Sequence, residues 1–172
     1  MNSNSRILHC INVRPLTMTD YNSVLYWSKD ESFCLANGWE YNQNSKELYQ
    51  WWLNCVNNKS EELVRLGITL HDRLIGYADL ASINNNTAEL GVAIGESALW
   101  GKGIGFYSAE CMMQYGFEEL GITVFNAETH EANVRSKKML GKLGFKEISR
   151  VGNEEYLGTN GQLIQYRLFY KN

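Results

Sequence analysis

Apolar and polar residues alternate along the middle of the chain in a pattern that predicts antiparallel strands. Residues 63–70 and 74–83 show this alternation in part, and residues 71–73 between them predict a turn. A second turn, at residues 84–86, leads into a further predicted strand over residues 87–95. Three consecutive strands joined by short turns predict an antiparallel meander.

The part of the chain before the meander is predicted to be mostly helical. A short strand over residues 12–16 precedes a helix over residues 21–27. Residues 29–43 show little periodicity and predict a loop or a broken helix. Residues 45–48 begin a further helix, which carries its apolar side chains on one side.

After the meander, helices and strands alternate. Apolar spacing predicts helices over residues 106–120 and 133–143, and Gly144 is placed to end the second one in a left-handed conformation. The other expected elements are strands over residues 123–129, 145–151 and 163–170, with a turn at residues 158–161. No change in composition divides the chain, so we expect one α/β domain with a mixed sheet over residues 1–172.

A glycine-rich loop joins the last meander strand to the helix that follows. Gly101, Gly103 and Gly105 alternate with larger residues, so few side chains block the backbone there. A strand, a glycine loop and a helix N terminus together suit a bound phosphate, because backbone N–H groups and the helix dipole favour negative charge. The loop matches neither the Walker nor the dinucleotide-binding pattern, and a tight turn without a ligand is the alternative.

Charge narrows the possible partners. The net charge is −3, with acidic and basic residues interspersed, so no basic patch of the size that nucleic acids need is present. The densest basic cluster consists of Arg135, Lys137, Lys138, Lys142 and Lys146. We expect this cluster to be a solvated helix face, the alternative being a few contacts to a small anionic ligand.

Cysteines and histidines give no sign of a metal or a nucleophile. Cys10, Cys34, Cys55 and Cys111 form no C-x-x-C pair, which argues against zinc or a disulfide framework and favours a reducing compartment. Residues 1–5 are polar and no apolar run approaches membrane-spanning length. We therefore expect a cytoplasmic protein with neither a membrane nor a nucleic acid as partner, and association of identical copies is left open.

Three motifs in register give the chain a family resemblance. They are the strand that carries Glu89, the loop over residues 100–105, and Asn133-x-x-Ser136 followed by a Leu-Gly-Phe sequence at residues 143–145. Their order and spacing resemble the GCN5-related N-acetyltransferase (GNAT) superfamily over nearly the whole chain. The resemblance is strongest to the branch of ribosomal-protein N-terminal acetyltransferases and spermidine acetyltransferases.

This resemblance implies a fold and a reaction. The fold would be α/β, with a mixed, mostly antiparallel central sheet that splays at the acetyl-CoA site and is flanked by helices. The reaction would move an acetyl group from acetyl-CoA directly to a primary amine, on a small amine, a polyamine or a protein N terminus, without a metal. The alternatives are a non-catalytic CoA-binding or sensing module, an aminoglycoside-type antibiotic acetyltransferase, and transfer of a longer acyl group.

The resemblance also implies which residues hold the cofactor. Backbone groups of Val92, Ala93 and Ile94 would pair with the pantetheine arm as an added strand does. Asn133 would hydrogen-bond the arm or simply cap its helix. The pyrophosphate would lie over the loop formed by Trp100, Gly101, Lys102, Gly103, Ile104 and Gly105.

Two residues are catalytic candidates by the same resemblance. Glu89 would take the proton of the attacking amine or hold the cationic amine, the alternative being an ordinary carboxylate on a strand face. Ser136 would hydrogen-bond the departing thiolate, unless it is merely a small residue that permits close approach. Leu140 stands where many family members carry a tyrosine acid, so that role is in doubt here.

The acceptor amine would lie on the opposite side of the gap from the cofactor. Aromatic rings and carboxylates suit a cation, although aromatic residues are more often part of a core. The candidate contacts are Trp27, Phe33, Trp39, Glu40 and Tyr41.

Overall fold

The computed structural model describes residues 10–171, which form a seven-stranded sheet in the order β1-β2-β3-β4-β5-β7-β6. The strands are β1 (Ile11–Arg14), β2 (Val64–Leu70), β3 (Arg73–Asn84), β4 (Thr87–Ile94), β5 (Val124–His130), β6 (Lys146–Tyr156) and β7 (Thr159–Phe169). The α-helices are α2 (Tyr21–Trp27), α3 (Glu31–Asn37), α4 (Ser45–Val56), α5 (Ile104–Leu120) and α6 (Val134–Leu143). Two 3₁₀ turns, η1 (Met18–Asp20) and η2 (Ser97–Leu99), complete the elements of the described chain. The prediction made for residues 1–5 lies outside it.

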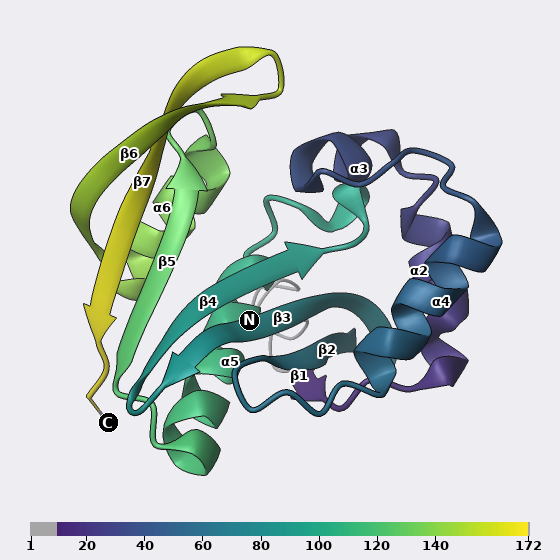
Figure 1. Cartoon of the computed structure of the whole chain (residues 1–172), viewed down its shortest axis with the longest axis horizontal. Coiled ribbons are helices and arrows are strands. Elements are labelled where there is room, and N and C mark those ends of the chain that lie inside the picture. The colour runs from purple at the N-terminus through teal and green to yellow at the C-terminus, as the bar shows by residue number, and fades with distance from the viewer. Residues whose placement is uncertain (1–9, 172) are drawn as a thin grey trace, which may run out of the picture.

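The sheet opens between β4 and β5. Strands β1 to β4 pair antiparallel in chain order, which confirms the predicted meander. β4 and β5 run parallel and pair over three residues only, from Thr87 opposite Val124 to Glu89 opposite Asn126. Beyond Glu89 the two strands diverge (Figure 1). The mixed, mostly antiparallel and splayed sheet is therefore confirmed.

Helices pack on both faces of the sheet because alternate strand residues point to opposite sides. Leu90 of β4 belongs to a core that includes residues of α5 and α6, which lie behind the sheet in Figure 1. Ala93 of the same strand belongs to a second core, formed with α2, α3 and α4. β4 thus separates two helical layers, and the opening beside it faces both.

The segment over residues 29–43 contains a helix, α3, which its short apolar pattern did not reveal. Asp30 caps it, since its Oδ1 accepts a hydrogen bond from the Phe33 N–H at 3.1 Å. Gly38 ends it in a left-handed conformation with φ of 66°. Seven residues give too few turns for a periodic signal, so the caps alone mark this helix.

The turn expected at residues 158–161 is displaced. β6 and β7 join through a two-residue turn at Leu157 and Gly158, both with positive φ, and residues 159–161 already pair with β6. A turn with two positive φ values favours asparagine and glycine. Leucine occupies the first of these positions here, which hid the turn from the sequence pattern.

A network at Asp20 supplies a prediction about stability. Arg14 donates two hydrogen bonds to the Asp20 carboxylate, at 2.7 and 2.9 Å, and Thr17 donates two more. Burial opposes ionisation of Asp20, but these donors outweigh it and lower the pKa of the carboxyl below its ordinary value of 3.8. Its contribution to stability is therefore complete above about pH 4 and is lost as the pH falls through the lowered pKa.

Asp20→Asn should accordingly reduce the free energy of unfolding by about 2 kcal/mol at pH 7, because Arg14 loses its carboxylate. The difference from the parent protein should shrink below pH 4. Urea denaturation at several pH values measures both effects. Glu61→Gln, at an exposed loop position, is the control and should change stability little. A constant difference down to pH 2 would contradict the assigned network.

Candidate functional site

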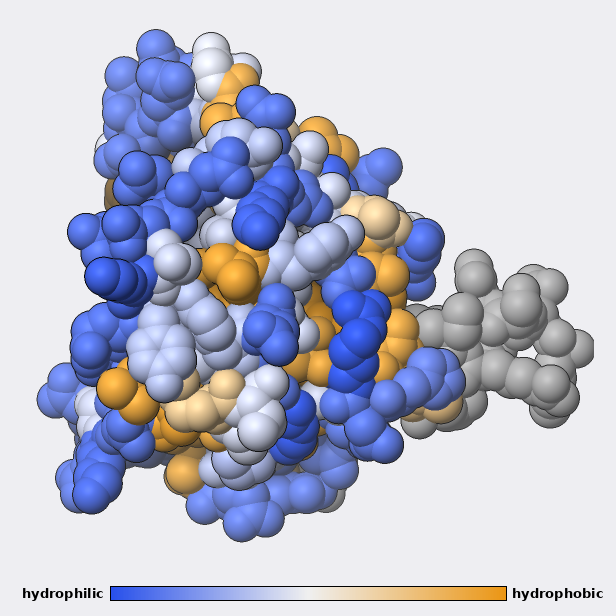
Figure 2. All heavy atoms as spheres, turned by 90° about the vertical axis from the view of Figure 1, so that its right-hand side faces the viewer, coloured by the Kyte–Doolittle hydropathy of each residue, from blue (hydrophilic) through white to orange (hydrophobic). Residues whose placement is uncertain are grey.

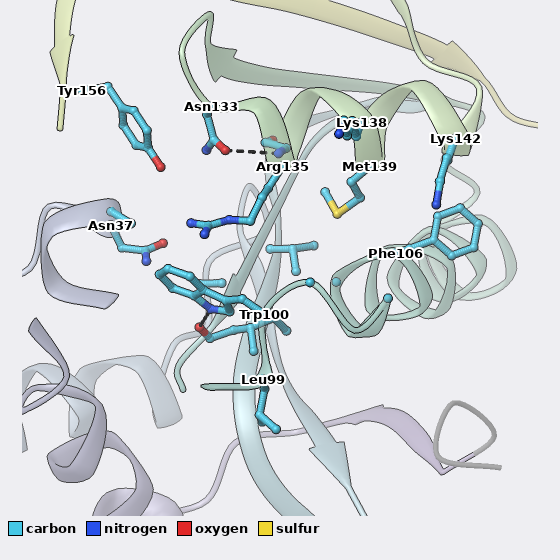
Figure 3. A pocket seen from close by; sticks show the side chains of 18 residues that line it. Asn37, Leu99, Trp100, Phe106, Asn133, Arg135, Lys138, Met139, Lys142 and Tyr156 are labelled. Atoms are coloured by element: carbon cyan, nitrogen blue, oxygen red, sulfur yellow. Dashed lines mark hydrogen bonds between the residues drawn. The ribbon is translucent and has the colours of Figure 1, made fainter. Parts of the chain in front are cut away.

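A cavity of about 360 Å³ occupies the opening between β4 and β5 (Figure 3). Its lining includes residues from α5 and α6, on one face of the sheet, and from α3, on the other. The cavity therefore passes through the gap in the sheet. It is lined by Ala36, Asn37, Val92, Ala93, Ile94, Leu99, Trp100, Gly101, Gly103, Gly105, Phe106, Asn133, Arg135, Ser136, Lys138, Met139, Lys142 and Tyr156.

The glycine loop forms one wall of this cavity. Gly101 and Gly103 have φ values of 76° and 82°, which favour glycine, and Gly103 caps α5. A Cβ on Gly105 would lie 3.3 Å from the Met139 sulfur, so glycine lets α5 approach α6 closely. α5 begins at Ile104, two residues earlier than predicted. Four of the six expected loop residues line the cavity: Trp100, Gly101, Gly103 and Gly105.

The other two loop residues lie elsewhere. Ile104 is 2% exposed and its side chain packs in the first core, because the earlier start of α5 turns it inward. Lys102 is exposed and does not line the cavity. The side chains of Ile104 and Lys102 therefore do not reach the cavity, although neighbouring residues of the loop line it.

Asn133 and Ser136 stand together at the start of α6. The Asn133 Oδ1 accepts a hydrogen bond from the Ser136 N–H at 3.1 Å, so Asn133 caps the helix. Its amide nitrogen has no partner within the described chain and remains available as a donor. Leu140, one turn after Ser136, is buried in the first core and brings no hydroxyl to the cavity.

Positive charge dominates the cavity. The first turns of α5 and of α6 both contribute to its lining, through Gly105 and Phe106 and through Arg135 and Ser136, and helix N termini carry partial positive charge. Arg135, Lys138 and Lys142 add three cations, and no acidic residue of the described chain lines the cavity. The cavity is therefore suited to an anion. The basic cluster expected as a solvated helix face is exposed at these three positions, and it also borders the cavity.

Trp100 connects the loop to α6. Its indole N–H donates to the Ile94 carbonyl at 2.9 Å, and the Arg135 guanidinium lies over the ring at 4.1 Å from its centroid. The predicted strand-edge residues Val92, Ala93 and Ile94 all line the cavity. Because Trp100 already binds the Ile94 carbonyl, that group is committed within the protein.

Glu89 lies at the root of the gap and not in the cavity lining. It is exposed and forms the last β4–β5 pair, with Asn126. Val92 follows three residues later, at a distance of about 10 Å along the strand at ~3.3 Å per residue. Glu89 therefore does not contact the cavity directly.

The predicted aromatic acceptor contacts form a core. Trp27 and Phe33 are 0% exposed in the second core, so the prediction that they contact a substrate is wrong. Trp39 packs edge-on between Phe33 and Trp51, with ring centroids 5.0 Å from each. Figure 2 shows the face of the molecule that carries α2, α3 and α4, where hydrophilic residues surround paler and hydrophobic patches.

Glu40 and Tyr41, by contrast, are exposed, and Trp39 is half-buried. None of the five predicted acceptor contacts lines the cavity. The aromatic residues of this segment therefore serve packing, and its acidic residues lie in a solvated loop next to α3. The residues of α3 that line the cavity are Ala36 and Asn37.

Sequence reasoning missed Asn37 and Tyr156, which lie at the end of the cavity away from Lys142 (Figure 3). Tyr156 stacks on His130 with ring centroids 5.5 Å apart. The His130 Nδ1 accepts the Ala132 N–H, so its Nε2 carries the proton and donates to the Glu154 carbonyl at 3.0 Å. No local pattern signals Tyr156, because the β6–β7 hairpin brings it back from a distant part of the chain.

Comparisons with known proteins agree with this geometry. A family model described as an acetyltransferase (GNAT) domain matches residues 11–146. A Methanocaldococcus jannaschii protein is 30% identical over 112 residues, which are 65% of this chain and 23% of that protein. The N-acetyltransferase p20 of Bacillus licheniformis is 29% identical over 100 residues, 57% of this chain and 54% of that one. The chain thus spans about half or less of the length of these relatives.

Solved structures share the fold over nearly the whole chain. Spermidine N-acetyltransferase from Vibrio cholerae, in complex with CoA and spermine, has a TM-score of 0.79 at 17% identity and covers 94% of this chain and 96% of its own. A ribosomal L7/L12 α-N-protein acetyltransferase in complex with CoA has a TM-score of 0.79 at 14% identity, covering 93% and 94%.

Two features are absent from residues 10–171. No group of three or more histidine, cysteine or acidic residues is arranged to hold a metal ion. No helix there has both the length and the apolar character needed to cross a membrane.

Proposed function

The chain belongs to the GNAT acetyltransferase family, and we propose that it transfers the acetyl group of acetyl-CoA directly to a primary amine. The observation that carries this proposal is the cavity that passes through the splayed sheet, with a cationic wall on the α5 and α6 side. A donor bound from that side and an acceptor entering from the α3 side would meet within the gap.

The residues present fit the donor. The β4 edge beyond Glu89 faces no partner strand, so its backbone groups are placed to pair with an amide-rich arm. The loop with Gly101 and Gly103 and the N terminus of α5 would hold the pyrophosphate. Lys138 and Lys142 would add charge for the remaining phosphate. Acetyl-CoA itself supplies a thioester that is reactive toward an unprotonated amine.

Three groups of this chain would then serve the reaction. Glu89 would accept the proton of the amine through water, because an ordinary amine is protonated at neutral pH. A backbone N–H on the β4 edge would stabilise the oxygen that gains charge, as an oxyanion hole does. Ser136 would donate a hydrogen bond to the departing thiolate. No tyrosine at the position of Leu140 can do so.

A thiol-release assay with acetyl-CoA tests the proposal. Polyamines, aminoglycosides and peptides with free N termini should be offered as acceptors, since relatives include spermidine and ribosomal-protein acetyltransferases. Thiol release that depends on one of these amines, with the acetylated amine seen by mass spectrometry, supports it. Thermal stabilisation by CoA without turnover on any amine would instead support a sensing module.

Gly103→Ala should weaken acetyl-CoA binding about 10-fold. Alanine pays about 1–2 kcal/mol to keep the positive φ of Gly103, so the loop shifts away from the phosphate-binding conformation. Gly121→Ala is the matched control, because Gly121 has a positive φ of 69° at the other end of α5. Isothermal titration calorimetry measures both variants. Equal affinity losses would show that the effect comes from α5 stability and not from the loop.

A further inference from the structure

We propose that the acceptor carries an anionic group, a carboxylate or a phosphate, in addition to its amine, and that Arg135 binds this group. The inference rests on the proposed acetyl transfer and specifies its acceptor class. Three observations carry it: the charge of the cavity, the way Arg135 is held, and the position of Arg135 relative to the other cations.

The charge of the cavity disfavours a polycation. Arg135, Lys138 and Lys142 line it, and within the described chain no carboxylate faces them there. Lys138 and Lys142 would face the phosphates of the donor, so Arg135 is the cation left to meet the acceptor, and it would repel a polyamine. An acceptor that carries a negative charge would instead be attracted to Arg135.

Arg135 is held in place with its hydrogen-bond donors free. Its guanidinium carbon lies over the Trp100 ring, 4.1 Å from the ring centroid, and Trp100 is in turn anchored to the Ile94 carbonyl. No carboxylate of residues 10–171 forms an ion pair with Arg135. A stacked guanidinium presents its N–H groups at its edge, in the fork that matches carboxylate or phosphate oxygens.

Arg135 lies toward the end of the cavity that the donor phosphates do not need. Figure 3 shows its guanidinium pointing toward Asn37 and Tyr156, whereas Lys142 lies beside Phe106 at the start of α5. Lys142 lies seven positions after Arg135, about 10 Å along α6. Asn37 and Tyr156 add an amide and a hydroxyl to the Arg135 end, which together recognise a polar group.

The amine would react close to Arg135. Ser136, which would contact the departing thiolate, follows Arg135 directly on α6, so the thioester carbonyl lies at this end of the gap. Glu89 lies farther away, at the root of the gap beside Asn126, and would act through water. The acceptor therefore needs no long spacer between its amine and its anionic group.

Matched acceptors test the proposal. In the thiol-release assay, 6-aminohexanoate is compared with 1,6-diaminohexane and hexylamine, and glucosamine 6-phosphate is compared with glucosamine. We expect the anionic member of at least one set to have a kcat/KM at least 10-fold above its matched partners. The two sets distinguish a carboxylate from a phosphate. Equal or better turnover of the amines that lack an anionic group, in both sets, overturns the proposal.

Variants separate the acceptor from the donor. Arg135→Gln should raise the KM of the anionic acceptor about 10-fold or more, with an unchanged dissociation constant for acetyl-CoA. Lys142→Gln should do the reverse, and Arg135→Lys should keep only part of the effect because lysine lacks the fork. Both positions are exposed, so folding should survive. If Arg135→Gln weakens acetyl-CoA binding as Lys142→Gln does, Arg135 belongs to the donor site and the proposal is wrong.

The two proposals fail in different ways. Turnover that favours polyamines leaves acetyl transfer intact and removes the anionic acceptor. Binding of CoA without turnover on any amine, anionic ones included, removes the acetyl transfer and the acceptor class together.

Discussion

Replacing Glu89 with glutamine should lower kcat at pH 7 by about 100-fold and leave the dissociation constant of acetyl-CoA nearly unchanged. General-base catalysis contributes roughly 10²–10⁴-fold, and a protonated amine cannot attack a thioester until it loses its proton. Glu89 is the carboxylate at the root of the gap, on the last β4–β5 pair, and it lies outside the cavity lining. Steady-state thiol release gives kcat, and calorimetry gives the affinity for acetyl-CoA.

The pH dependence sharpens this test. As the pH rises toward the pKa of the amine, about 10, more acceptor is already deprotonated, so the deficit of Glu89→Gln should narrow. Glu128→Gln is the control, since Glu128 is an exposed carboxylate on β5 that hydrogen-bonds Gln165. It should retain the parent kcat. An unchanged kcat for Glu89→Gln across the whole pH range would remove Glu89 as the proton acceptor.

Replacing Gly76 with alanine should destabilise the protein by about 3 kcal/mol and also weaken acetyl-CoA binding. A Cβ at Gly76 would overlap the Ala93 carbonyl oxygen and lie 3.1 Å from the Ile94 Cα. Both neighbours are backbone atoms, which cannot yield as a flexible side chain does, and overpacking of this kind costs 1–3 kcal/mol or more. Because Ala93 and Ile94 line the cavity, a displaced β4 also moves the wall of the site.

Gly91→Ala is the matched control for this prediction. Gly91 lies on β4, where a Cβ would meet only the Asp79 Cβ at 3.7 Å, an ordinary contact. Urea denaturation should therefore show little change for Gly91→Ala and a large loss for Gly76→Ala. Calorimetry on the folded fraction measures the effect on acetyl-CoA. Parent-like stability of Gly76→Ala would contradict the close β3–β4 approach described here.

The predictions from sequence succeeded where a few neighbouring residues decide the structure. The meander follows from period-two alternation and short turns, and the end of α6 follows from Gly144, whose φ is 92°. Even the errors of this kind are local. A leucine in a turn position that favours asparagine displaced the β6–β7 turn, and α3 was too short to show a period.

The parts of the candidate site that could be predicted were its glycine loop, the start of α6 and the edge of β4. The glycines of the loop and Asn133 signal their roles through backbone conformation and capping, which depend on adjacent residues. Side chains brought together across the fold gave no such signal. Tyr156 returns on a hairpin, and Trp27 is recognisable as core only once α2 lies on the sheet.

By itself, then, the sequence determined the order of most elements and the glycine loop between β4 and α5, whereas the phosphate-bearing donor was implied by the family resemblance of its motifs. These follow from interactions within a turn or a few residues, which every chain with this pattern makes. Only the tertiary structure decided that the gap in the sheet holds a cavity open to both faces and that its charged lining is cationic. It also decided that Arg135 lies stacked on Trp100 with its donors free. Such features depend on how helices that are distant in sequence pack against each other. That packing is set by the shapes of side chains from different segments, which no pattern of neighbouring residues encodes.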